Sequence, residues 1–233
     1  MKFIIKKSAY TLSEVLITLS LIGFLATMTL ATIGSSVQQR ARLAEFRTAY
    51  AKLDNSLRST IDETGRIMQC YDSDGSAWTD FGLNLSAGTP SPQMTECANL
   101  TSIMARNMGA IKTCPAGQSA QCLPLNYPTL NAVWQNYTNS PVYILENGMI
   151  FITMRPDSTF GIAMDVNGRK GPNRWGLDIF PFVIAIKETK RVNGALQVTN
   201  VGIMPPRSAN DNVSNGQLKS TAQLMKDSAN NPN

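Results

Sequence analysis

The stretch that decides the fold is KKSAYTLSEVLITLSLIGF, residues 6–24, in which two lysines precede an apolar run that holds one acid, Glu14. No charged residue follows between Val15 and Gln39. Since about 20 apolar residues cross a bilayer as a helix, the sequence predicts a membrane-spanning segment at about residues 15–37. A carboxylate at the N-terminal end of such a segment needs an explanation, because an unpaired charge in a membrane is costly.

The helix is expected to continue beyond the apolar run. Apolar residues recur there at spacings of three and four, and charged residues of both signs lie between them. This stripe consists of Leu43, Phe46, Tyr50, Leu53, Leu57 and Ile61. No proline precedes Pro90, and Gly65 is a suitable C-terminal cap. The sequence therefore predicts one helix from about Thr11 to Thr64, within a helical region at residues 10–65, whose rear half packs on the globular domain.

The amino-acid composition changes after Gly65. Residues 66–140 are rich in Ser, Thr, Asn, Gly and Pro, which favours loops with a short helix near Cys97–Met108. From Pro141 onward the pattern is typical of β-strands, and Asn147-Gly148 predicts a hairpin turn. Further strands are expected at Thr159–Asp165, Ile179–Lys187 and Leu196–Met204, with Pro181 favouring an edge position or a late start for the second of them.

These patterns predict an α+β fold with an antiparallel sheet. The globular head is expected at residues 66–204. Residues 205–233 lack aromatic side chains and apolar periodicity, so they are expected to form a flexible tail.

Composition excludes several functions. The 233 residues include no histidine, which removes Ser-His-Asp and Cys-His catalysis and every His-ligated metal site. The net charge is +5, but the basic residues are scattered, so no nucleic-acid partner is expected. The sequence has no phosphate loop, dinucleotide fingerprint or nucleophile elbow. We therefore expect a protein that is not an enzyme.

The four cysteines, Cys70, Cys97, Cys114 and Cys122, are expected to form disulfides. None of them makes a close Cys-x-x-Cys pair, and all follow the predicted membrane segment, which favours an oxidising compartment. Three pairings are open. The pairing Cys70–Cys97 with Cys114–Cys122 is favoured because it closes the smaller loops. Free buried thiols are the alternative, since Cys is among the most buried residue types.

The order SAYTLSEVL, residues 8–16, follows lysines and precedes an apolar helix, and it resembles the class III signal of type IV pilins and type II secretion pseudopilins. In that family a prepilin peptidase cuts after a small residue and methylates the new N-terminal amine, and a glutamate occupies the fifth mature position. By this resemblance residues 1–9 are the leader, Ala9 precedes the cut, Tyr10 becomes the N-terminus and Glu14 is the fifth residue. Ala9 stands where the family usually has Gly, and Tyr10 where it usually has Phe.

The resemblance implies a pilin-like fold, with the long helix packed on the sheet, and a structural function. The subunit would be processed by prepilin peptidase and assembled with other pilin or pseudopilin subunits into a type II secretion pseudopilus or a type IV pilus. Glu14 of one subunit would neutralise the N-terminal amine of the preceding subunit. The chain would cross the bacterial inner membrane once, with a cytoplasmic N-terminus and a periplasmic head. The alternative is a membrane-anchored exported binding protein that does not polymerise.

A second motif, DVNGRKGPNRWGLDIF at residues 165–180, combines oxygen ligands with glycines. Its candidate ligands are Asp165, Asn167, Asn173 and Asp178. Some type II secretion pseudopilins bind calcium in a C-terminal loop, and this loop is placed similarly. Ca²⁺ takes six to eight oxygen ligands, and three basic residues interleave the acids. The alternative is a strand connector in which Asp and Asn bond their own turns.

Overall fold

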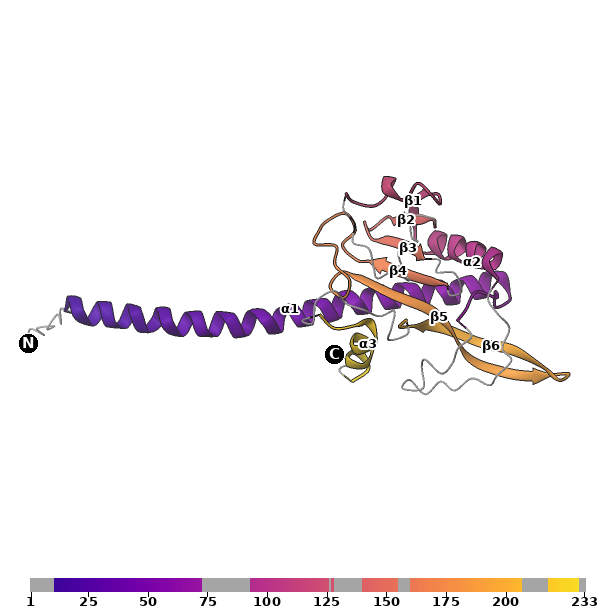
Figure 1. The fold of residues 1–233 in the computed structure, drawn as a ribbon. Coiled ribbons are helices and arrows are strands. Elements are labelled where there is room, and N and C mark those ends of the chain that lie inside the picture. The colour runs from indigo at the N-terminus through magenta and orange to yellow at the C-terminus, as the bar shows by residue number, and fades with distance from the viewer. Residues whose placement is uncertain are drawn as a thin grey trace, which may run out of the picture. The chain divides into compact units, whose positions relative to one another are not determined.

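The structure is a computed structural model in which residues 11–72, 93–125, 127, 140–154, 160–206 and 218–230 are described, apart from the side chains at 28–36 and 94. These residues form an α+β protein with three α-helices, one short 3-10 helix and one six-stranded antiparallel sheet (Figure 1). The predicted fold class is therefore confirmed at this level. The chain divides into two compact units, Met1–Ala41 and Arg42–Asn233.

Helix α1 spans Leu12–Thr64, which is 53 residues, as the sequence predicts. It ends at Gly65, whose backbone has φ = +66° and whose N–H donates to the carbonyl of Ile61 at 2.9 Å. Because residues with a β-carbon rarely adopt this left-handed conformation, glycine ends the helix here.

The part of α1 that belongs to the head unit buries its apolar stripe. Its fully buried positions are Phe46, Ala49, Leu53 and Leu57. They share one core with apolar residues of the sheet, and the ring of Phe46 lies 5.5 Å from that of Phe180 and 5.8 Å from that of Phe182. The helical spacing in the sequence thus identifies the buried side of this segment.

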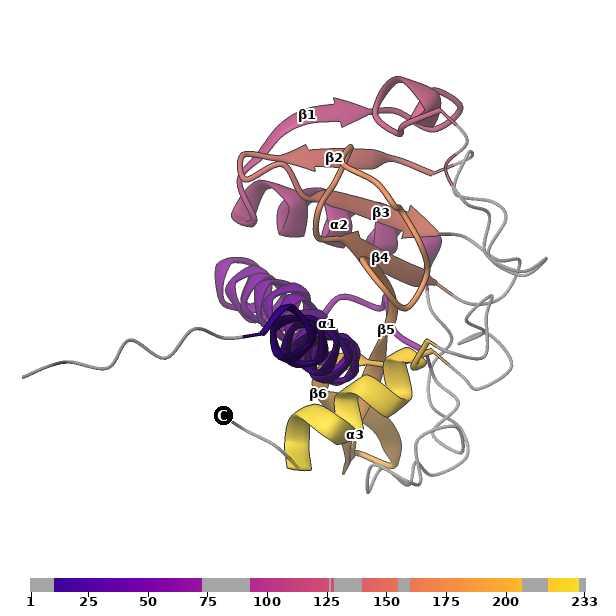
Figure 2. The same ribbon diagram turned by 90° about the vertical axis from the view of Figure 1, so that its left-hand side faces the viewer.

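The sheet is a meander in which each strand pairs with the next one along the chain, so the order is β1-β2-β3-β4-β5-β6 (Figure 2). The strands are β1 (Ala110–Cys114), β2 (Val142–Leu145), β3 (Ile150–Met154), β4 (Gly161–Asp165), β5 (Ile179–Val192) and β6 (Ala195–Met204). The predicted hairpin turn at Asn147-Gly148 joins β2 to β3, and Gly148 has φ = +85°. Because each strand is antiparallel to the next one along the chain, the sheet has no crossovers.

Pro181 lies inside β5, which is not an edge strand. Pro181 pairs with Ala163 of β4, whereas the pairing of β5 with β6 begins only at Val183 and Met204. The proline therefore occupies the part of β5 with one neighbouring strand, where a missing N–H removes no ladder hydrogen bond.

Both faces of the sheet are buried in its central part, over β3, β4 and the first half of β5. One core contains residues of α1, α2 and the strands, including Phe151, Phe180 and Phe182. A second core contains the alternate strand residues, such as Ile152 and Val183, together with other parts of the head. Strands that are covered on two sides need apolar residues at every position, which explains why β3 to β5 read as nearly continuous apolar runs.

The two disulfides join Cys70 to Cys97 and Cys114 to Cys122. The first ties the segment after α1 to helix α2 (Met94–Asn107), which forms where the sequence predicts a short helix. The second closes the loop that contains the 3-10 helix η2 (Ser119–Gln121). The predicted pairing is confirmed, and the alternative of free thiols is wrong.

Helix α3 (Thr221–Asn230) differs from the flexible tail that the sequence predicts for residues 205–233. The N–H of Ser220 donates to the Gln223 side chain at 2.9 Å, and the N–H of Gln223 donates to the Ser220 hydroxyl at 3.3 Å. This reciprocal pair is a capping box. Leu224 is 2% exposed and belongs to the core beside α1 and α2, so tertiary packing stabilises this ten-residue helix.

Candidate functional site

The first turn of α1 holds the Glu14 carboxylate in place. Both the N–H and the hydroxyl of Thr11 donate to its Oε2 atom at 2.9 Å, and the N–H of Glu14 lies 3.4 Å from the Thr11 hydroxyl. This is again a capping box, here with the pattern T-x-x-E. In the described part of the chain, Oε1 of Glu14 has no partner, so one carboxylate oxygen can accept a further donor. The predicted cleavage residues Ala9 and Tyr10 lie outside the described residues.

The described front of α1 is apolar and uncovered. Its large side chains Leu12, Leu16, Ile17, Leu21 and Phe24 have exposed fractions between 58% and 80%. A contiguous apolar surface of this kind marks contact with protein or lipid. Glu14 therefore stands among side chains that need a partner.

No helix in the part of the chain that the structure describes is long and apolar enough to cross a membrane. The predicted segment at about 15–37 includes residues 28–36, whose side chains are not described. The membrane segment stays a prediction.

The four candidate ligands of the second motif come together in one hydrogen-bonded cluster between β4 and β5. The Asp178 carboxylate, which is 2% exposed, accepts the side-chain N–H of Asn167 at 2.9 Å and the backbone N–H of Asn173 at 2.8 Å. It also accepts the backbone N–H of Arg174. The Asn173 amide is oriented to donate to the Gly168 carbonyl at 2.8 Å and to Asp165 at 3.2 Å.

Asp165 is the most buried member of this cluster, with an exposed fraction of 0%. One of its oxygens accepts the N–H of Gly168 at 2.7 Å, and the other accepts the hydroxyl of Tyr127 at 2.9 Å. Burial raises the pKa of Asp165 to about 7, although these two hydrogen bonds oppose the shift. Asp165 can thus keep its proton near neutral pH.

The hydrogen bonds of this cluster match the alternative prediction, a connector between two strands in which Asp and Asn bond their own turns, more directly than they match a shell of calcium ligands. Backbone and side-chain donors occupy the carboxylates of Asp165 and Asp178, which is how Asp and Asn stabilise a turn. Among the described residues no group of three or more Asp, Glu, Cys or His side chains is arranged to hold a metal ion. Calcium binding by this loop stays a prediction.

A pH dependence of stability follows from Asp165. Its pKa is about 7 in the folded chain and about 3.8 in the unfolded chain, so the folded state binds the proton more tightly. The contribution of Asp165 to the free energy of unfolding is therefore full below pH 3.8. This contribution, on the order of 4 kcal/mol, is lost as the pH rises to about 7. We expect Asp165→Asn to remove this pH dependence of the free energy of unfolding. Denaturant unfolding of the wild-type chain and of the variant between about pH 4.5 and 7.5 measures it. Parallel pH profiles for the two chains would contradict the expectation.

A polar pocket of about 480 Å³ lies in the head between α1, the end of α2 and the strands β1 and β2. Its wall includes Lys52, Asn55, Ser59, Arg106, Asn107 and Glu146. Arg106 pairs with Glu63 of α1. Amide, hydroxyl and charged groups suit a polar ligand better than an apolar one.

Two contacts of these sites were not predicted. Thr11 is visible in the sequence as the first residue of a T-x-x-E capping pattern. Tyr127 carries no such signal, because it belongs to no recognisable motif of the sequence and reaches Asp165 only through the tertiary fold.

Comparisons with models of protein families, with curated proteins and with solved structures find no match for this chain.

Proposed function

We propose that the chain is a structural, pilin-like subunit that is processed by prepilin peptidase and assembled into a type II secretion pseudopilus or a type IV pilus. The observation that carries the proposal is the Glu14 carboxylate in the first turn of α1. The helix is apolar and uncovered just after this acid, and its rear half supplies the core of a disulfide-bonded head. An anchor without an assembly role would use this carboxylate only to cap the first turn of the helix.

Glu14 would act by pairing with an amine. Cleavage after Ala9 would leave a cationic N-terminus on Tyr10, at the boundary of the apolar segment. The Glu14 carboxylate of one subunit would accept this amine from its neighbour through Oε1, while Thr11 keeps Oε2 in position. A subunit in the wrong register would leave a buried charge unpaired, and such a charge costs roughly 3–5 kcal/mol. The pair would therefore select the correct register.

The proposed location follows from the same features. The lysines before Ala9 would hold the N-terminus in the cytoplasm by the positive-inside rule. The front of α1 would cross the inner membrane at about residues 15–37, and the head would lie in the periplasm, where disulfides persist. The apolar helix would stay out of water in both states, in lipid before assembly and among other helices afterwards.

The alternative is a membrane-anchored exported binding protein that does not polymerise. The polar pocket between α1, α2 and the β1–β2 pair favours this reading, because it offers a site for a polar ligand. Such a protein would use α1 only as a tether. It would need neither cleavage after Ala9 nor an amine for Glu14.

The N-terminal peptide of the protein taken from membranes of its native host separates the two functions. The proposal predicts a peptide that begins at Tyr10 and carries one added methyl group, as measured by mass spectrometry. A peptide that begins at Met1 would remove the amine that Glu14 is proposed to meet, and the anchored binding protein would then be the better reading.

A further inference from the structure

Three Asn-Gly pairs lie in the described part of the chain, at 147–148, 167–168 and 193–194. Such a pair can modify itself, because glycine leaves its backbone nitrogen open to attack the side-chain amide carbon of the preceding asparagine. The product is a five-membered imide, which water opens to an acidic residue. A fourth pair, at 215–216, lies outside the described residues. The three described pairs differ in the state of the attacking nitrogen and in how easily each turn opens.

The turn between β2 and β3 is held closed. The Gly148 N–H donates to the carbonyl of Leu145 at 2.9 Å, and the side-chain oxygen of Asn147 accepts the N–H of Met149 at 3.2 Å. The two strands that the turn joins are mostly buried. Gly168 packs on the turn so closely that a β-carbon there would lie 1.9 Å from the Gly148 carbonyl oxygen. Both reacting groups of this pair are therefore occupied.

The pair Asn167-Gly168 is held by a buried cluster. The Gly168 N–H donates to the Asp165 carboxylate at 2.7 Å, and the Asn167 side-chain N–H donates to the Asp178 carboxylate at 2.9 Å. Gly168, Asp165 and Asp178 are all buried. Opening this turn would break contacts inside the head, so it requires the surrounding structure to open as well.

The pair Asn193-Gly194 differs from the other two. It forms the tip of the β5–β6 hairpin, with φ of 51° and 82°, and both residues are exposed. Two positive φ angles are typical of a two-residue hairpin turn. In the part of the chain that the structure describes, the Gly194 N–H donates to no acceptor. Of the three described pairs, this one alone has a free attacking nitrogen.

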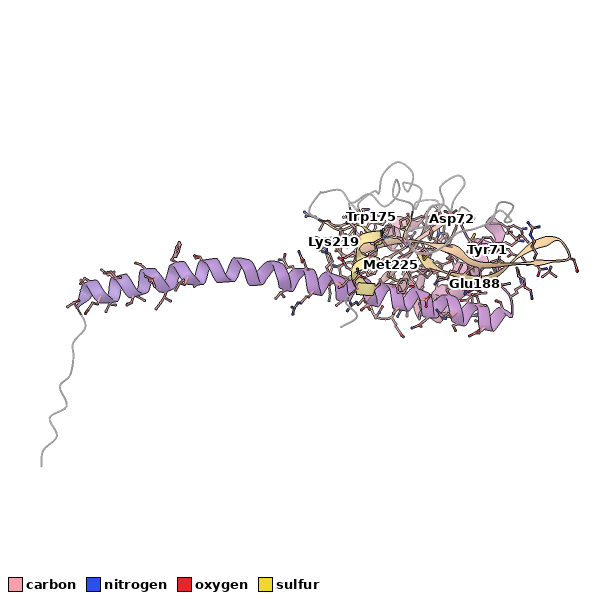
Figure 3. All side chains as sticks on the ribbon, turned by 90° about the horizontal axis from the view of Figure 1, so that it is seen from below. Tyr71, Asp72, Trp175, Glu188, Lys219 and Met225 are labelled. Atoms are coloured by element: carbon pink, nitrogen blue, oxygen red, sulfur yellow. A yellow bond between two sulfur atoms is a disulfide. The ribbon has the colours of Figure 1, made fainter. Side chains whose placement is uncertain are left out.

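The strands behind this tip open more easily than the rest of the sheet. The pairing of β5 with β4 ends at Val183, and from Glu188 onward the hairpin is a ribbon of two strands (Figure 3). Its residues from Glu188 to Asn200 are exposed or half-buried. A two-stranded ribbon is marginally stable in water, and local opening of such a segment costs little free energy. Ring closure requires the backbone of the asparagine to rotate, so its rate follows this opening.

We propose that Asn193 is a site of spontaneous deamidation, and that it converts faster than Asn147 and Asn167 in the folded chain. The Gly194 nitrogen attacks Cγ of Asn193, a C–N bond forms, and the bond from Cγ to Nδ2 breaks. The amide leaves as ammonia, which takes up the proton that the Gly194 nitrogen loses. Water then adds to either carbonyl of the imide and gives aspartate or isoaspartate, without any change in oxidation state.

The conversion changes both the charge and the geometry of the tip. Residues 187–200 include three basic side chains and one acid, so their net charge falls from +2 to +1. Isoaspartate also lengthens the main chain by one carbon atom, so the tip can no longer keep its two-residue turn. The inference goes beyond the proposed function and does not depend on it.

Timed incubation of the purified full chain in mildly alkaline buffer with mild detergent tests the site. Peptide mass spectrometry follows the conversion of each asparagine to its acid. In the folded chain we expect Asn193 to convert about tenfold faster than Asn147 and Asn167, or more, since a tenfold ratio needs a difference of only about 1.4 kcal/mol in opening free energy. In urea, where all three turns are open, the three rates should become comparable.

Asn193→Gln is the matched variant. It keeps an amide at the tip, but its longer side chain would have to close a six-membered ring, so the fast conversion should disappear while Asn147 and Asn167 react as before. Conversion of Asn147 or Asn167 as fast as Asn193 in the folded chain would overturn the proposal. A tenfold preference for Asn193 that persists in urea would also overturn it, because the fold would then not select the site.

This test and the test of the proposed function fail separately. The incubation uses the purified chain without peptidase or filaments, so a slow Asn193 leaves the proposed function standing. An N-terminal peptide that begins at Met1 would refute the proposed function and leave the deamidation of Asn193 unaffected.

Discussion

Replacing Glu14 with alanine is expected to lower incorporation of the chain into filaments by roughly 100-fold or more. Without the carboxylate, the N-terminal amine of a neighbouring subunit would enter an apolar environment unpaired, which costs roughly 3–5 kcal/mol. The measurement is the ratio of chain in sheared filaments to chain in membranes, for cells that express only the variant. Cleavage after Ala9 should continue, so the N-terminal peptide of the variant should still begin at Tyr10.

Glu14→Gln separates the charge from the helix cap. The Gln side chain keeps the size of Glu and can still accept the N–H of Thr11, the bond that Glu14 makes at 2.9 Å. It cannot neutralise an amine, so we expect the same loss of incorporation as for Glu14→Ala. Normal incorporation of the Gln variant would show that the capping bond, and not charge pairing, explains the acid at this position. Thr11→Ala, which removes the hydroxyl but keeps the carboxylate, should reduce incorporation much less.

The elements that local rules govern could be predicted from the sequence. The stripe from Phe46 to Leu57 predicts the buried side of α1, and Asn147-Gly148 predicts the β2–β3 hairpin. The disulfide pairing favoured from the sequence is the one found, and each bridge links a cysteine to the next cysteine along the chain. In each case the residues that determine the structure lie close together along the chain.

The elements that depend on tertiary contacts could not be predicted in the same way. Ser220 and Gln223 form a capping box at the start of α3, but the pattern STAQLM at residues 220–225 is short and polar, and the packing of Leu224 in the core stabilises the helix. The hydrogen bond from Tyr127 to Asp165 joins residues 38 positions apart in the sequence, at the end of β4. The sequence names the polar residues of the β4–β5 loop as candidates, but the identity of their hydrogen-bond partners depends on the folded backbone.

The head should also be sensitive to the loss of a single aromatic side chain of α1. Phe46 is 1% exposed, and its ring lies within 6.3 Å of the rings of Tyr50, Phe180 and Phe182. Phe46→Ala removes most of a buried ring and leaves a cavity, which costs about 3–5 kcal/mol. Since domains are stable by about 5–15 kcal/mol, this one change would remove a large share of the total.

Unfolding of the purified full chain by urea in mild detergent, followed by tryptophan fluorescence, measures this loss. Thr48→Ala is the matched control, because Thr48 is exposed two residues away and alanine is the better helix former, so its free energy of unfolding should stay within about 0.5 kcal/mol. Phe46→Leu keeps much of the volume and should cost less than the alanine change. If Phe46→Ala and Thr48→Ala unfold at the same urea concentration, α1 does not share a core with the sheet. The head would then have to hold together without the helix, and its link to the front of α1 would depend on chain connectivity alone.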